Sequence, residues 1–118
     1  MNISSNTIFL FIITSSRNVE DRFLYDAEYC IKSIRSKGVE LANIIVATDT
    51  EFNLVCAKCP AVNGVSFITS EQIPSTIENL QGDNLIVVTD CHGTIQGIDA
   101  KNTILPHTLT TALKNNPS

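Results

Sequence analysis

The stretch that decides the fold is Leu85-Ile-Val-Val-Thr89, which leads directly into Asp90-Cys-His-Gly-Thr94. A run of apolar residues without polar alternation predicts a strand that is covered on both faces, as in a parallel sheet. In such sheets, ligands and catalytic groups gather beyond the carboxyl ends of the strands. His92, followed by a glycine, is therefore expected where chemistry takes place. The plainer alternative is a solvent-exposed histidine in a loop.

Three more apolar runs predict further strands. Residues 8–14 are apolar on both faces and predict a central strand, and residues 44–48 predict a second short one. Residues 65–68 are a candidate for a small extra strand.

Helical spacing of apolar residues, with start and stop signals, predicts the helices between these strands. Gly38 stops the first helix, and Pro74 must lie in the first turn of a later one. The predicted helices are residues 21–37, 49–59, 70–80 and 106–114.

The alternation of strands and helices predicts an α/β fold, a parallel sheet of three or four strands flanked by helices in three layers. Residues 1–118 would form a single domain. The right-handed crossover rule gives the strand order 2-1-3. Strand 85–89 would then lie at an edge, with unpaired backbone groups. A partner chain, a second copy or a missing C-terminal half is expected to add beside it.

Composition excludes some functions. The chain has 118 residues, 43% of them hydrophobic and 17% charged, with a net charge of −4. No block of basic residues is present, so a nucleic-acid partner is not expected. The apolar run 8–13 is too short to span a membrane and lacks the features of a signal peptide, which predicts a cytoplasmic protein without membrane association.

The four cysteines, Cys30, Cys56, Cys59 and Cys91, are expected to be reduced thiols in a chain without an export signal. Cys56-Ala-Lys-Cys59 has the spacing of a redox or zinc motif. No second pair follows, however, and the motif comes after the second strand instead of opening a helix after the first. Plain buried or surface thiols are favoured, and neither a metal nor a cofactor is predicted.

The order strand, polar loop, Asp-containing helix, strand, helix, strand and His-Gly resembles the caspase-like superfamily of cysteine peptidases, which includes caspases, legumains and separases. In that family a His-Gly follows the third strand. The segment Thr89-Asp-Cys-His-Gly93 differs from the legumain-like Thr-Asp-His-Gly by the inserted Cys91. Residues 95–99 and 104–113 resemble the turn and helix that follow.

The resemblance implies roles for individual residues. His92 would be the general base or acid of a Cys-His pair, and the backbone N–H of Gly93 would help to form the oxyanion hole. The segment Arg22-Phe-Leu-Tyr-Asp26-Ala resembles one in legumain-like enzymes whose arginine lines the substrate pocket. Arg22 and Asp90 are therefore the predicted substrate-binding residues. Asp26 is expected to support the fold.

The nucleophile is missing from this pattern. In caspase-type enzymes the cysteine follows the histidine by about 50 residues, and no cysteine follows His92 in this chain. Cys91 and His92 are neighbours near a strand end, so their side chains should diverge. The resemblance thus implies the His-bearing portion of a cysteine endopeptidase, completed by a C-terminal portion or subunit that carries the cysteine and acting on protein or peptide substrates. The isolated chain should be inactive.

Two alternatives remain open. Asp90-Cys-His-Gly-Thr94 resembles the Asp-x-Asp-Gly-Thr of haloacid-dehalogenase-like phosphatases, which use a magnesium ion, with His92 in place of the second aspartate. The other alternative is a non-catalytic pseudo-peptidase that docks a partner through the edge of strand 85–89.

Overall fold

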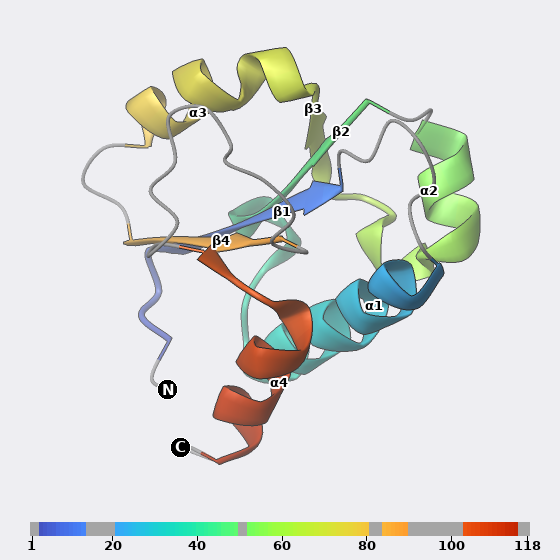
Figure 1. Cartoon of the computed structure of the whole chain (residues 1–118). Helices are drawn as coiled ribbons and strands as arrows, with labels where there is room; N and C mark the ends of the chain where they lie inside the picture. The colour runs from blue at the N-terminus through green and yellow to red at the C-terminus, as the bar shows by residue number, and fades with distance from the viewer. Residues whose placement is uncertain (1–2, 14–20, 50–51, 81–83, 90–102, 116–118) are drawn as a thin grey trace.

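The computed structural model describes residues 3–13, 21–49, 52–80, 84–89 and 103–115, with the backbone alone for residues 21–23 and 52. Within these ranges every strand belongs to one parallel sheet, in the order β3-β2-β1-β4-β5 (Figure 1). The predicted α/β fold is confirmed, and its predicted order 2-1-3 corresponds to the observed order β2-β1-β4.

The element boundaries lie close to those predicted. The strands are β1 (Thr7–Ile13), β2 (Ile44–Thr48), β3 (Ser66–Ile68), β4 (Asn84–Val88) and β5 (Thr103–Ile104). The α-helices are α1 (Asp21–Ser36), α2 (Phe52–Lys58), α3 (Ile73–Asn79) and α4 (Pro106–Lys114). Short 3₁₀ turns are η1 (Leu41–Asn43), η2 (Pro60–Val62) and η3 (Ser70–Gln72). No helix in the described ranges is long and apolar enough to cross a membrane.

β1 is the central strand, because its side chains are buried on both faces of the sheet. Phe9 and Phe11 belong to one core cluster, and Leu10 and Ile12 to the other. Successive side chains of a strand point to opposite faces, so this division follows from the period of two. The sequence of β1 thus lacks polar alternation because both faces of the strand are buried, as expected for a parallel sheet.

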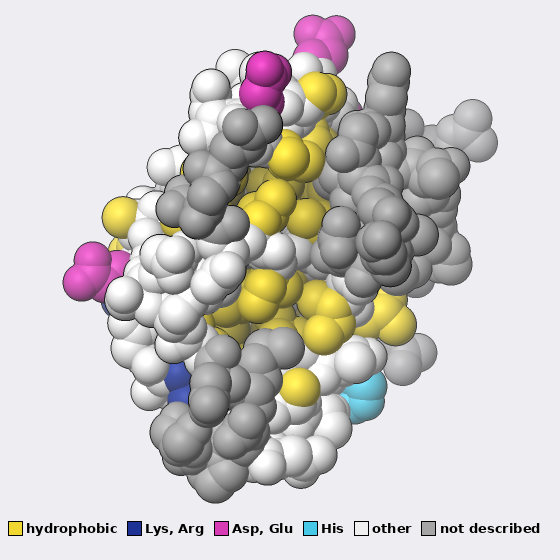
Figure 2. All heavy atoms as spheres, turned by 90° about the vertical axis from the view of Figure 1, so that its left-hand side faces the viewer, with side chains coloured by type: hydrophobic (Ala, Val, Ile, Leu, Met, Phe, Trp, Pro, Cys, Tyr) yellow, Lys and Arg dark blue, Asp and Glu magenta, His cyan; other side chains and the backbone are white. Residues whose placement is uncertain are grey.

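The helices cover the two faces unequally. α1, α2 and α4 lie on the face with the larger core cluster, whereas α3 lies on the opposite face (Figure 1). Viewed from the end at which β1 and β4 begin, hydrophobic side chains form a band across the middle of the molecule (Figure 2). Hydrophobic residues that are only partly buried pack against the α3-side core: Ile45, Ile68, Ile77 and Leu85.

α1 ends where the sequence predicts. Gly38 has a φ of +95°, a conformation that side chains with a Cβ rarely adopt. Its N–H donates to the carbonyl of Arg35 at 3.0 Å, and the N–H of Val39 donates to that of Ile34 at 3.3 Å. These bonds satisfy carbonyls that the helix leaves free at its end.

The prediction that strand 85–89 lies at an edge of the sheet is wrong. β4 lies between β1 and β5, with Val87 opposite Thr103 and Val88 opposite Ile104. The N–H of Thr89 also donates to the carbonyl of Ile104, at 3.1 Å. Since β5 has only two residues, it carries no periodic pattern by which the sequence could have predicted it. The chain itself supplies a neighbour for the end of β4.

Candidate functional site

The candidate site begins where β4 ends. Val88 is completely buried and Thr89 is 5% exposed, so the strand stays inside the protein up to the carboxyl edge of the sheet. The chain leaves β1 toward β2 on one side, and β4 pairs with β1 on the other. The strand order therefore changes direction between β1 and β4. Open α/β sheets bind their ligands in the crevice outside such a point.

Most of the predicted catalytic and binding residues lie outside the ranges that the structure describes. Asp90, His92 and Gly93 lie outside the described residues, as does Cys91. Arg22 lies in the first turn of α1, and its side chain is not described. α1 begins on the side toward which the strands point (Figure 1). The backbone of Arg22 and the last residue of β4 thus lie on the carboxyl side of the sheet.

Cys30 is a packing residue. It lies on the buried face of α1, as predicted, and is completely inaccessible to solvent. Burial raises the pKa of its thiol to about 11, although a hydrogen bond with Thr110 of α4 acts in the opposite direction. The Cys30 thiol therefore stays protonated at neutral pH and joins α1 to α4.

Cys59 and Cys56 differ in exposure. Cys59 is completely buried, whereas Cys56 is half-buried on the last turn of α2. Burial, followed by the negative charge of Glu28, raises the pKa of Cys59 to about 12. Partial burial also raises the pKa of Cys56. Because the thiolate is the reactive form of cysteine, burial lowers the reactivity of both thiols, and more so that of Cys59.

Asp49 is a polar residue at the carboxyl edge that sequence reasoning missed. It follows β2, and its carboxylate accepts hydrogen bonds from the backbone N–H of Ser70 at 3.1 Å and from the Ser70 hydroxyl at 2.7 and 2.8 Å. These bonds tie the end of β2 to the start of η3. An aspartate directly after a strand was the available signal, but its partner lies 21 residues away.

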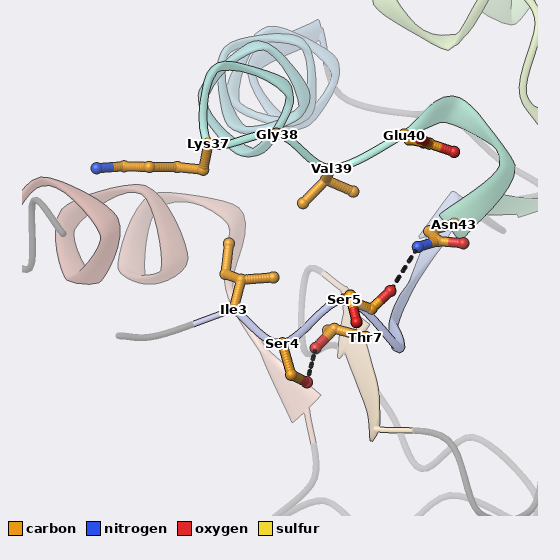
Figure 3. Close-up of a pocket in the computed structure, with 9 residues that line it drawn as sticks. All are labelled: Ile3, Ser4, Ser5, Thr7, Lys37, Gly38, Val39, Glu40 and Asn43. Atoms are coloured by element: carbon orange, nitrogen blue, oxygen red, sulfur yellow. Dashed lines mark hydrogen bonds between the residues drawn. The ribbon is translucent and has the colours of Figure 1, made fainter.

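A cavity of about 330 Å³ lies away from this edge (Figure 3). It lies between the start of β1 and the segment that follows α1. Its hydroxyl and amide groups bond to one another: Ser4 lies 2.9 Å from Thr7, oxygen to oxygen, and Asn43 donates to the carbonyl of Ser5 at 3.2 Å. Its lining holds neither a thiol nor an imidazole, so it offers no groups for the predicted chemistry.

In the described ranges, no three His, Cys, Asp or Glu side chains are grouped so as to hold a metal ion. Comparisons with family models, with curated proteins and with solved structures give no match to this chain.

Proposed function

We propose that this chain is the His-bearing portion of a caspase-like cysteine endopeptidase, which needs a second segment or chain to supply the catalytic cysteine. His92 would exchange protons with the cysteine and the leaving group, and the N–H of Gly93 would stabilise the oxyanion. Arg22 and Asp90 would contact the substrate. Such a reaction would need neither a metal ion nor a cofactor, because the cysteine thiolate itself attacks the carbonyl carbon of the substrate.

The observation that carries this proposal is the pairing of β4 with β1. Phe11 of β1 lies opposite Val88 of β4, and the segment that contains His92 follows β4 after one further described residue, Thr89. β4 thus ends at the change of strand direction, where parallel α/β proteins bind their ligands. This topology supports the proposal, because the sequence motif follows the strand that reaches this edge.

The state of the described cysteines supports an external nucleophile. Cys30 and Cys59 are buried, and their thiols have pKa values raised to about 11 and about 12. Cys56 has a raised pKa as well. A peptidase cysteine attacks as a thiolate, and the raised pKa values favour the protonated thiol at all three positions.

The proposal is tested by purifying the chain at native stoichiometry with whatever binds it, then adding a peptide that carries a thiol-reactive group. Intact-mass analysis should find the label on one cysteine of a partner or of a C-terminal continuation. Label that appears only on this chain, or on no chain, would contradict the proposal.

A non-catalytic docking module is the second candidate, favoured by the shape of the sheet edge. β5 pairs only with Val87 and Val88, so within the described residues the outer side of Asn84–Ile86 has no neighbouring strand. An extended segment of a partner can add to such an edge through backbone hydrogen bonds. Binding of the partner without labelling of any cysteine would favour this function.

A further inference from the structure

The end of α2 brings together two thiols and a carboxylate that the proposed peptidase chemistry does not use. Cys56 lies in the last turn of α2, and Cys59 is the first residue after that helix. The N–H of Cys59 still donates to the carbonyl of Val55, at 2.8 Å, so the helical path continues to Cys59. Residues three apart on a helix have Cβ atoms about 5–6 Å apart and lie on the same face.

One thiol of this pair is accessible and the other is not. Cys56 is half-buried, whereas Cys59 is fully enclosed by the core. A disulfide reagent in solution can therefore reach Cys56 but not Cys59. In such an arrangement the accessible thiol, Cys56, can react first with a disulfide from solution. The buried thiol, Cys59, can then react with the mixed disulfide from inside the protein.

The carboxylate of Glu28 on α1 lies beside the inner thiol. It forms a hydrogen bond with the side chain of Cys59. It also accepts the N–H of Ala61 at 2.5 Å and pairs with Lys32 at 3.3 Å. Because these contacts hold the carboxylate in place, it can accept the proton that Cys59 must release.

The backbone leaves the helix at the inner cysteine. Cys59 has φ −135° and ψ 74°, outside the helical region, and Pro60 then begins η2. A disulfide needs Cβ atoms about 3.5–4.5 Å apart, which is 1–2 Å closer than helical spacing gives. Since Cys59 lies at this junction, a rotation there can close the gap without breaking α2.

We propose that Cys56 and Cys59 are a redox-active dithiol, which reduces small-molecule or protein disulfides and closes to an intramolecular disulfide. This inference stands independently of the proposed peptidase activity. The sequence alone did not favour it, since the motif follows the second strand of the sheet; the unequal burial of the two thiols and the contact with Glu28 are what the structure adds.

The reaction has two thiol–disulfide exchanges. Cys56 loses its proton to water, and its sulfur attacks one sulfur of the substrate disulfide; the first substrate thiolate leaves and is protonated. Cys59 then gives its proton to Glu28 as its sulfur attacks the Cys56 sulfur of the mixed disulfide, and the second substrate group leaves as a thiolate, which is then protonated. Two electrons pass from the two cysteines to the substrate, whose disulfide becomes two thiols.

The test treats the full chain with oxidised glutathione, quenches it with acid and alkylates the remaining thiols. A protease that cuts after glutamate at Glu51 and Glu71 releases residues 52–71, which contain Cys56 and Cys59 and no other cysteine. The expected product is this peptide without alkyl groups and lighter by two hydrogen atoms than its reduced form. Persistence of a glutathione adduct on Cys56, or full alkylation of both residues, would overturn the proposal.

Two substitutions of the inner thiol separate the steps. Cys59→Ser and Cys59→Ala should both stop the reaction at a glutathione adduct on Cys56, with folding checked by circular dichroism. If one of these variants fails to fold, the other variant and the unmodified chain still test the proposal. The absence of the adduct in a folded variant would show that Cys56 is not the attacking thiol, against the proposal.

Glu28→Gln provides a matched control for the carboxylate, because glutamine retains an oxygen that accepts the N–H of Ala61. Glutamine cannot take up the Cys59 proton, so ring closure should slow by roughly 10²-fold, the lower end of the usual contribution of general acid–base catalysis. Stopped-flow measurement of the second exchange step checks this. An unchanged or faster closure would overturn the role given to Glu28.

Discussion

Phe11 in β1 and Val88 in β4 lie opposite each other in parallel register, and both are completely buried. The register means that β4 reaches the carboxyl edge beside the central strand of the sheet. β1 continues for two more residues, to Ile13, on the same buried path. β4 therefore ends at the change of strand direction, and the segment that contains His92 follows β4 in the sequence.

The first prediction concerns His92. His92→Ala should reduce peptide cleavage by the completed enzyme by about 10²–10⁴-fold, the usual contribution of general acid–base catalysis. The matched control is His107→Ala, because His107 is the other histidine of the chain and is exposed on α4. Steady-state cleavage of a fluorogenic peptide measures both. Equal activity of the two variants would exclude His92 as the base.

The second prediction concerns Phe11. Phe11→Ala should lower the free energy of unfolding by about 3–5 kcal/mol, because it leaves a cavity in the core between β1 and the helices of that face. Phe11→Leu fills more of this space and should cost less. Urea unfolding followed by circular dichroism gives both values. A loss below that of an exposed control, Leu54→Ala, would contradict the burial of Phe11.

The third prediction concerns the link between Asp49 and Ser70. Asp49→Ala should cost about 1–2 kcal/mol of unfolding free energy, since it leaves the N–H at the start of η3 without its acceptor. Asp49→Asn retains one acceptor oxygen and should cost less. A double-mutant cycle with Ser70→Ala should show that the two losses are not additive. Additive losses would mean that the contact contributes nothing.

The fourth prediction concerns stability in alkaline solution. The pKa values of Cys30 and Cys59 are raised from 9.0 to about 11 and about 12 in the folded protein. The unfolded chain therefore loses these protons first as the pH rises. The stability that the two thiols contribute is fully present below pH 9 and falls between about pH 9 and pH 12.

Cys30→Ala and Cys59→Ala should each flatten this alkaline decrease, although each also lowers stability at neutral pH by removing a buried group. Urea unfolding under reducing conditions at several pH values separates the two effects. Curves for the variants that run parallel to the original curve across the alkaline range would contradict the raised pKa values.

Local patterns predicted most elements, because their signals lie within a few residues of one another. The helix 106–114 was predicted with the bounds of α4, and the small strand at 65–68 is β3, one residue shorter. β1 and β4 each begin one residue earlier than predicted. β5 was missed, since two residues cannot show a period, and with it the prediction of an edge position for β4 failed.

The sequence predicted two properties of the candidate site: its residues, from a short motif, and its position, from the buried strand that precedes the motif. The motif at His92 is a local sequence pattern, and its place after a buried strand follows from the run Leu85–Thr89. Pairs that lie far apart in the chain were not predicted: Asp49 with Ser70, and Glu28 with Cys59. No period or spacing connects such residues before the chain has folded.

The sequence by itself determined the alternation of strands and helices, the double-faced burial of β1 and the end of α1 at Gly38. These follow from side-chain periodicity and from the backbone freedom of glycine, both of which act over a few residues. Only the tertiary structure decided the neighbours: β5 beside β4, η3 on Asp49, and Glu28 on the inner thiol of a cysteine pair. The reason is that strand register and core packing are set by contacts between distant segments, which compete for the same buried space.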